Sequence, residues 1–336
     1  MKKLLVNIFL IGTFVGAAAM AWAIVAFKGN AVREDVSLYV EPESDYAALK
    51  ESLLPHIKHH TAFSIYSSHL DLEQTFKTGH YYLQRGESII EIVRRLKLGM
   101  QTPVRVTFNN VRTVGQLSAR LSEQLAADSL QFAEAFSSET LAREVGYDSL
   151  TLFSMFIPDT YELYWTVSPE DFVRRMKRES ERFWTGVRDE QCKAVGLSRL
   201  EVMTLASIVY EETAKTDEMP RIAGVYMNRL KKGMPLQADP TIKYALQDFT
   251  LRRILHKHLR YKSPYNTYIN KGLPPSPIAM PSKAAIDAVL RYERHNYLYF
   301  CARPTFDGYH VFATTYSDHL RNARAYAAAL DSRNIK

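Results

Sequence analysis

One helix of this chain, predicted over residues 198–217, is apolar on almost every side and must be buried in whatever fold forms around it. Ser198 followed three residues later by Glu201 is the start signal of a capping box. A helix with so few polar positions is typical of the centre of a domain. Its hydrophobic side chains are Leu200, Val202, Met203, Leu205, Ala206, Ile208 and Val209.

Two adjacent acids, Glu211 and Glu212, lie near the end of this helix. Residues three, four and seven positions apart share a helix face, so Glu212 is in line with Val209, Ile208 and Leu205, whereas Glu211 is in line with more polar residues. A carboxyl on an apolar stripe loses hydration, which raises its pKa and suits it to act as a general acid. The alternative is a frayed last turn in which both acids face water.

The N-terminus carries a long uncharged run, residues 4–27, which follows Lys2 and Lys3. A membrane-spanning helix needs roughly 20 apolar residues, and this run is long enough. The two lysines favour a cytoplasmic N-terminus and an exported body. The alternative is a cleaved signal peptide, because residues 19–21 and 21–23 resemble small-residue cleavage sites. A signal's apolar core is usually only about 7–15 residues, so we favour a retained anchor.

The composition is that of an ordinary globular chain of about two domains, with 336 residues, 46% hydrophobic and 24% charged. The net charge of +7 favours a partner with an acidic surface. Nucleic acid, anionic lipid and a carboxylate-bearing polymer all remain candidate partners. A basic helix predicted at 169–187 is read as solvated rather than as a nucleic-acid surface, because its aromatic residues lie on the core side.

The sequence gives little reason to expect a metal or a cofactor. Cys192 and Cys301 are the only cysteines, so they permit at most one disulfide and no cysteine cluster. His56, His59 and His60 are read as a solvated helix end, since no further ligand has a recognisable spacing. No glycine-rich nucleotide loop is visible.

Strands and helices are mixed along the chain without regular alternation, which predicts an α+β fold. The small strand, helix and strand unit at 81–108 is typical of a binding module. Residues 150–165 are expected to form a rim or core-sealing loop, and five prolines make 263–282 irregular. Other strands are predicted at 36–40, 297–301 and 309–313, and other helices at 46–60, 114–126, 130–145 in two pieces, 220–232, 239–246, 283–292 and 318–330.

Two further segments carry polar residues suited to a site. Asp239 stands before Pro240, where it is either an N-cap or a catalytic acid. The proline-rich loop combines aromatic faces with amide and hydroxyl groups, which suits a sugar ring, although a merely stiff surface loop is the alternative. The loop residues concerned are Tyr265, Asn266, Thr267 and Tyr268.

Several motifs resemble, in order, the catalytic domain of the YceG-like (MltG) family of endolytic murein transglycosylases. They are IPDTY (157–161), ASIVYEET (206–213), IAGVYMNRL (222–230), LQADPTIKYAL (236–246), YNTYINKGLPPSPI (265–278), YLYF (297–300) and GYHVF (308–312). The resemblance implies a cytoplasmic stub and transmembrane anchor at 1–28, a linker and LysM-like module at 29–110, and a YceG-like catalytic domain at 111–336.

The resemblance also implies an activity. The family cleaves the MurNAc-β-1,4-GlcNAc bond of peptidoglycan without water, leaving a 1,6-anhydroMurNAc end and ending nascent glycan strands. Its essential glutamate falls on Glu212. Family members usually show Glu-Lys-Glu-Thr there, whereas this chain has Tyr210-Glu211-Glu212-Thr213, so the first acid of that motif is a tyrosine. The residues expected to position the substrate are Gln237, Asp239, Asn266, Thr267 and Tyr268.

The expected setting is the bacterial cell (inner) membrane, crossed once, with the catalytic domain on the periplasmic or extracytoplasmic side. The partners implied are peptidoglycan strands and the membrane, with peptidoglycan synthases as candidate neighbours and no nucleic acid. Two alternatives stay open. One is a muramidase-like hydrolase that uses Glu212 and Asp239 as a pair, and the other is a membrane-anchored, non-catalytic peptidoglycan-binding scaffold, which Tyr210 keeps in consideration.

Overall fold

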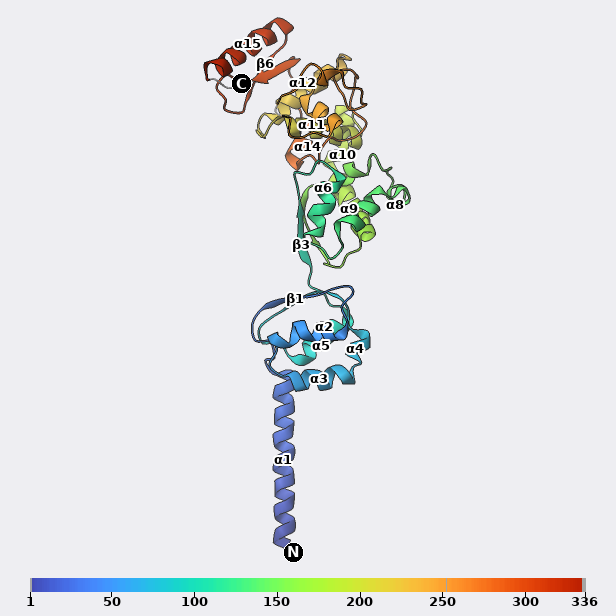
Figure 1. The fold of residues 1–336 in the computed structure, drawn as a ribbon, viewed down its shortest axis with the longest axis vertical. Coiled ribbons are helices and arrows are strands. Elements are labelled where there is room, and N and C mark those ends of the chain that lie inside the picture. The colour runs from blue at the N-terminus through green and yellow to red at the C-terminus, as the bar shows by residue number, and fades with distance from the viewer. Residues whose placement is uncertain (1, 252, 334–336) are drawn as a thin grey trace. The chain divides into compact units, whose positions relative to one another are not determined.

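The computed structural model describes residues 2–251 and 253–333, with side chains from residue 6 onward, and divides into two compact units. The first unit comprises the described residues up to Val106, together with Ser122–Ala127 and Tyr161–Ser168. The second comprises Thr107–Leu121, Asp128–Thr160 and the described residues from Pro169 onward. Helices and strands are mixed along the chain (Figure 1), which confirms the predicted α+β class.

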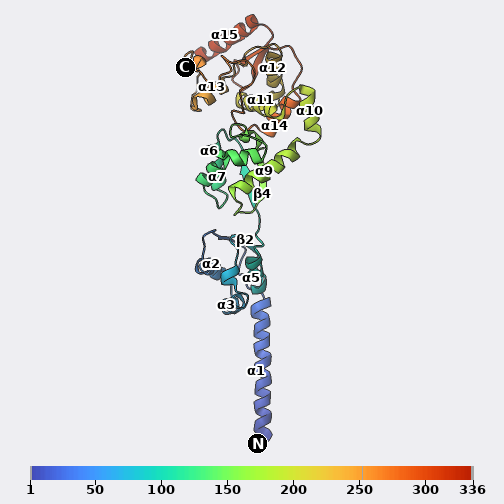
Figure 2. The ribbon, with the colours of Figure 1, turned by 90° about the vertical axis from the view of Figure 1, so that its right-hand side faces the viewer.

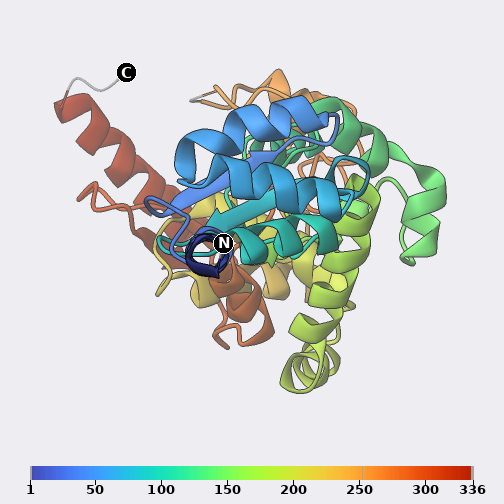
Figure 3. The ribbon, with the colours of Figure 1, turned by 90° about the horizontal axis from the view of Figure 1, so that it is seen from below.

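The first unit begins with α1, Lys2–Lys28, of which Val6–Lys28 is long and apolar enough to cross a membrane. Its apolar side chains are mostly exposed along its length. Figure 3 shows this helix end on. In the last turn Ala26 is buried, and the ring of Phe27 meets the ring of Tyr66 edge-on with centroids 6.1 Å apart. The C-terminal end of α1 therefore belongs to the core of the first unit.

The rest of the first unit is a two-stranded antiparallel sheet with short helices. Strands β1, Val36–Val40, and β2, Gly79–Leu83, pair with Val36 opposite Leu83 and Val40 opposite Gly79. The helices are α2 Tyr46–Leu53, η1 Leu54–His56, α3 His60–His69, α4 Leu72–Thr75 and α5 Ile89–Leu98. Helix α5 begins with a capping box at Ser88 and ends at Gly99, whose φ of 65° is left-handed.

One expectation for this unit was wrong. The helix predicted at 46–60 is broken at Pro55, because proline cannot donate the backbone hydrogen bond of a helix interior. The strand, helix and strand predicted at 81–108 are present, but the two strands belong to different sheets. Strand β2 pairs with β1, whereas β3, Val104–Phe108, pairs with β4, Asp159–Leu163.

The second unit is built around α11, Arg199–Glu212, which packs against α10, α12, α13 and α14 (Figure 2). Its remaining elements are α6 Val114–Ser122, α7 Ser129–Ser137, α8 Glu139–Glu144, η2 Leu152–Met155, α9 Pro169–Trp184, α10 Val187–Val195, α12 Met219–Lys231, α13 Asp239–Leu246, η3 His258–Arg260, α14 Lys283–Leu290, β5 Tyr299–Ala302, β6 His310–Ala313 and α15 Tyr316–Ser332.

Helix α11 has the environment that its sequence predicts. Ser198 and Glu201 form the capping box, and every side chain from Val202 to Val209 is at most 1% exposed. Burying each large apolar side chain contributes about 1.5–3 kcal/mol. The buried Ser207 hydroxyl donates to a carbonyl of its own helix and accepts from the backbone N–H of Ile278 at 3.0 Å. This bond ties the helix to the irregular proline-rich loop.

Other parts of the second unit differ from expectation. Residues 150–165 do help to seal a core, since Phe153 and Phe156 are buried, but they also supply η2 and strand β4. The sequence did not predict α10, which follows the left-handed Gly186. Cys192 and Cys301 are free thiols.

Candidate active site

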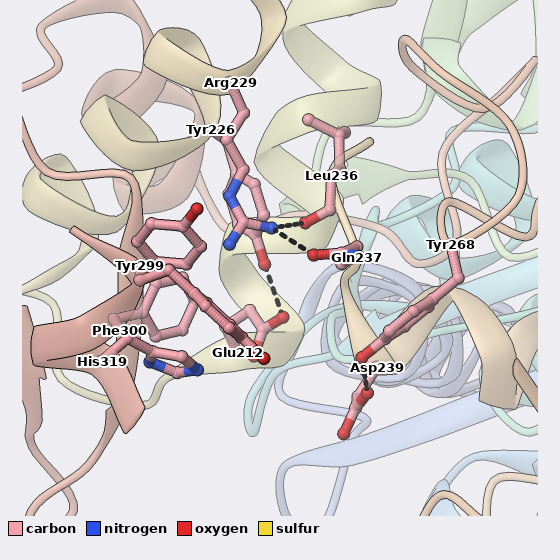
Figure 4. Close-up of a pocket in the computed structure, with 11 residues that line it drawn as sticks. Glu212, Tyr226, Arg229, Leu236, Gln237, Asp239, Tyr268, Tyr299, Phe300 and His319 are labelled. Atoms are coloured by element: carbon pink, nitrogen blue, oxygen red, sulfur yellow. Dashed lines mark hydrogen bonds between the residues drawn. The ribbon is translucent and has the colours of Figure 1, made fainter. Parts of the chain in front are cut away.

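A cavity of about 400 Å³ has Glu212, the last residue of α11, in its wall (Figure 4). The other walls come from α12, from the segment that leads into α13, from the proline-rich loop, and from β5 and α15. The lining residues are Glu212, Tyr226, Arg229, Leu236, Gln237, Asp239, Tyr268, Tyr299, Phe300, Tyr316 and His319.

The carboxyl of Glu212 has a strongly perturbed pKa. Burial raises this pKa from 4.5 to about 7, and the charge of Asp239 acts in the same direction. Glu212 is also at the C-terminal end of a helix, where the backbone dipoles disfavour a negative charge. A carboxyl with a pKa near 7 exchanges its proton readily at neutral pH, which is the property required of a general acid or base.

Tyr226 on α12 holds one oxygen of this carboxyl. Its buried hydroxyl donates to Oε1 of Glu212 at 2.6 Å, and its ring meets Phe300 edge-on with centroids 5.9 Å apart. This hydrogen bond lowers the pKa of Glu212 and so opposes the effect of burial. Oε2 of Glu212 accepts no hydrogen bond from the described part of the chain, which leaves it available to a ligand.

Arg229, one helical turn after Tyr226, places a buried cation beside the cavity. Its Nε donates to the carbonyl of Leu298 and its Nη1 to the carbonyl of Leu236, both at 2.6 Å, and its guanidinium lies over the ring of Tyr299. No carboxylate pairs with it within ion-pair distance in the described residues. Its charge therefore acts on the cavity, where it lowers the pKa of Glu212.

Gln237, Asp239 and Tyr268, three of the predicted positioning residues, do line the cavity. The hydroxyl of Tyr268 donates to Oδ1 of Asp239 at 2.5 Å. Of the two alternatives for Asp239, the N-cap was wrong, because Ala238 occupies the N-cap position and Asp239 is the first residue of α13. Its carboxylate is thus turned to the cavity and to Tyr268 instead of to backbone N–H groups.

Asn266 and Thr267, the other two predicted positioning residues, are not brought to the cavity. Asn266 is fully buried, and its side-chain amide donates to the carbonyls of Leu259 and Tyr261 while its oxygen accepts from the N–H of Tyr268. The hydroxyl of Thr267 accepts from the N–H of Ala238. Both residues fix the loop against the segment before α13, and so set the positions of Tyr268 and Asp239.

Sequence reasoning missed two parts of the wall. Tyr226 and Arg229 lie three residues apart on one face of α12. An arginine on the apolar face of a predicted helix can be recognised in the sequence, and it would have indicated a buried charge near the site. Tyr299 and His319 stack with ring centroids 5.3 Å apart. Burial lowers the pKa of His319, and its Nδ1 is a buried atom with no hydrogen-bond partner among the described residues.

The cavity offers one carboxyl of raised pKa among polar and aromatic side chains. In the described part of the chain no group of three or more His, Cys, Asp or Glu side chains is arranged to hold a metal ion. Aromatic rings, an amide, carboxyls and a guanidinium surround Glu212, a set that can bind the apolar face and the hydroxyls of a sugar.

Comparison with known proteins gives consistent matches. The YceG-like family model matches residues 38–325. An endolytic murein transglycosylase of Bacillus subtilis (strain 168) is 29% identical over 83% of this chain and 80% of its own length. One from Streptococcus pneumoniae (strain ATCC BAA-255 / R6) is 30% identical over 79% of this chain, which spans 53% of that protein. The crystal structure of a yceG-like protein from Listeria monocytogenes shares the fold, with a TM-score of 0.59 and 24% identity, and covers 86% of this chain and 98% of its own.

Proposed function

The chain belongs to the YceG-like family, and we propose that it is a peptidoglycan lytic transglycosylase with Glu212 as its catalytic acid and base. It would cleave the MurNAc-β-1,4-GlcNAc bond without water and leave a 1,6-anhydroMurNAc end on nascent strands. The observation that carries the proposal is a carboxyl with a pKa near 7, set in the wall of a sugar-sized cavity, with Oε2 available to the substrate.

The proposed reaction needs one carboxyl in both protonation states. Protonated Glu212 donates through Oε2 to the glycosidic oxygen as the bond from that oxygen to the anomeric carbon breaks. The C6 hydroxyl of the same MurNAc residue then attacks the anomeric carbon, and the Glu212 carboxylate removes its proton. The products together have the mass of the substrate. Such proton transfer contributes typically about 10²- to 10⁴-fold, and the tethered nucleophile adds a gain in effective molarity.

Hydrolysis is the second candidate, because Asp239 lines the same cavity as Glu212 and could activate a water molecule. Under the transglycosylase proposal Asp239 only positions Tyr268 and the sugar, so Asp239→Asn retains measurable turnover and an anhydro product. Under hydrolysis the same change abolishes turnover. The products also differ by the mass of one water molecule.

The deciding experiment is digestion of purified peptidoglycan by the full chain in detergent, with the products weighed by mass spectrometry. Glu212→Gln should lower turnover at least about 100-fold while circular dichroism stays that of the folded protein. The matched control is Glu190→Gln, which removes an exposed acid on α10 outside the cavity. Wild-type turnover by Glu212→Gln would refute the assignment, and binding without release of any soluble fragment by the wild type would favour the scaffold.

We also propose that α1 is a retained single-pass anchor in the bacterial cell membrane, with the body on the extracytoplasmic side. Support comes from its 23-residue apolar span and from the packing of Ala26 and Phe27 into the first unit.

We propose that the chain divides into segments 1–28, 29–110 and 111–336, and that the middle segment is a LysM-like peptidoglycan-binding module. An anchored enzyme of this kind would act near peptidoglycan synthases, its proposed neighbours.

A further inference from the structure

A second cavity, of about 560 Å³, also has Glu212 in its wall. Its other lining residues include Asn110 and Arg112 from the chain before α6, and Tyr210 and Glu211 from the last turn of α11. The candidate acid therefore borders two cavities. A polymer whose scissile bond lies at Glu212 has sugar units on both sides of that bond, and each cavity can take the units of one side.

The second cavity contains a cation that is held in place and only partly neutralised. Nε of Arg112 donates to both carboxylate oxygens of Glu211, at 3.0 and 3.1 Å, and the guanidinium lies over the ring of Phe249. Nη1 and Nη2 of Arg112 make no hydrogen bond with the described part of the chain, and its side chain is 33% exposed. A fixed guanidinium with two unused donor groups is suited to bind a carboxylate through both oxygens.

The same cavity offers an aromatic face. Tyr210 is half-buried in the cavity wall, and burial raises the pKa of its hydroxyl, which therefore stays protonated at neutral pH. The ring provides an apolar surface for a sugar, and the hydroxyl can bond to its polar groups. An aromatic face beside a carboxylate-binding group matches a sugar that bears an acidic substituent.

We propose that this second cavity binds the peptide-bearing muramyl residue next to the cut, with Arg112 contacting a carboxylate of its stem peptide and Tyr210 packing on the sugar. This assignment rests on the proposed function, because only a peptidoglycan substrate brings such a residue to Glu212. Of the two alternating sugars, only the muramyl unit carries the acidic peptide. Glu211 then has a defined effect, since its negative charge partly neutralises the Arg112 guanidinium that the peptide carboxylate contacts.

The test compares two substrates, glycan strands that carry stem peptides and the same strands after an amidase has removed them. The measured quantity is the ratio of kcat/KM for peptide-bearing strands to kcat/KM for bare strands, with the full chain in detergent. Arg112→Gln should lower this ratio about three- to fivefold, mainly through KM, because the ion pair it removes is partly exposed. Glu211→Gln should raise the ratio, since it removes the negative charge that partly neutralises the guanidinium. Arg112→Lys should give an intermediate ratio.

The control is Arg143→Gln, which removes an exposed arginine of an ion pair on α8 and should leave the ratio unchanged. An equal loss on both substrates for Arg112→Gln and Glu211→Gln would mean that the ion pair is only structural, and would overturn the inference. The proposed function would still stand if bare strands gave an anhydro product. Absence of that product from both substrates with the wild type would refute the proposed function and the inference with it.

Discussion

Glu212→Gln should make the folded protein more stable at alkaline pH while it removes turnover. In the unfolded chain the Glu212 carboxyl titrates near 4.5, and burial raises its folded pKa to about 7. Between these two values the folded state binds more protons than the unfolded state, so the free energy of unfolding falls as pH rises. The penalty is absent below pH 4.5 and fully present above pH 7.

The size of the penalty follows from the shift. The pKa difference of about 2.5 corresponds to at most about 3.4 kcal/mol, because one pKa unit is about 1.36 kcal/mol. Glu212 is only half-buried and borders two cavities, so solvent reduces this to about 1–2 kcal/mol. Glutamine has the shape of the protonated carboxyl, carries no charge, and can still accept the hydroxyl of Tyr226. The variant therefore avoids the penalty without leaving a void.

The assay is thermal unfolding of the full chain in detergent at pH 4 and pH 8.5, followed by near-UV circular dichroism. Trp184, which is 1% exposed and packs in the same core as α11, reports on the second unit. At pH 8.5 the Tm of Glu212→Gln should exceed that of the wild type by about 3–6 °C, and the difference should vanish at pH 4. Glu190→Gln is the control. A Glu212→Gln variant that is equally or less stable at pH 8.5, or whose gain is the same at both pH values, would refute the reasoning.

Three further predictions concern other parts of the chain. Tyr226→Phe removes a hydrogen bond to the Glu212 carboxylate, so the alkaline limb of the kcat/KM profile should move up by about 1–2 pH units; a downward or absent shift would contradict the proposed acid role. Asn266→Ala leaves two backbone carbonyls and one N–H unpaired and should cost about 2–4 kcal/mol, measured as a lower Tm; an unchanged Tm would mean that the loop does not depend on this side chain. The full chain should stay with lipid vesicles through a high-salt wash, because α1 binds by apolar burial, whereas release by salt would indicate attachment by charge alone.

The sequence predicted those elements whose signals are local. The capping box at Ser198 and Glu201 marked the start of α11, and the structure contains that capping box. Strand β4 was missed, and the pairing of distant strands was not predicted. Strand β4 pairs with β3, some fifty residues earlier in the chain, and β2 pairs with β1 across α2, η1, α3 and α4. Nothing in five residues of sequence specifies which strand will lie beside them.

The site was predictable to a similar extent. Helical spacing selected Glu212, and the structure gives that residue the raised pKa that the apolar stripe predicted. The loop residues Asn266 and Thr267 show the limit of this reasoning. Composition marked them as polar groups in a rigid loop, but polar side chains in a loop can bond to backbone as well as to a ligand. Only the folded structure shows whether such a side chain bonds to the backbone or is available to a ligand.

The surroundings of Glu212 balance opposing effects on one pKa, and this balance bears on how a single carboxyl could serve twice. Burial, the end of α11 and the charge of Asp239 favour the protonated form, whereas the Tyr226 hydroxyl and the Arg229 guanidinium favour the carboxylate. If only the effects that favour protonation were present, the carboxyl would be a poor proton donor. If only the opposing effects were present, it would be ionised before the substrate arrived. The effects that favour protonation exceed those that oppose it and place the pKa at about 7, so at neutral pH neither charge state is strongly preferred. The proposed mechanism requires this condition of an acid that must become the base within one reaction.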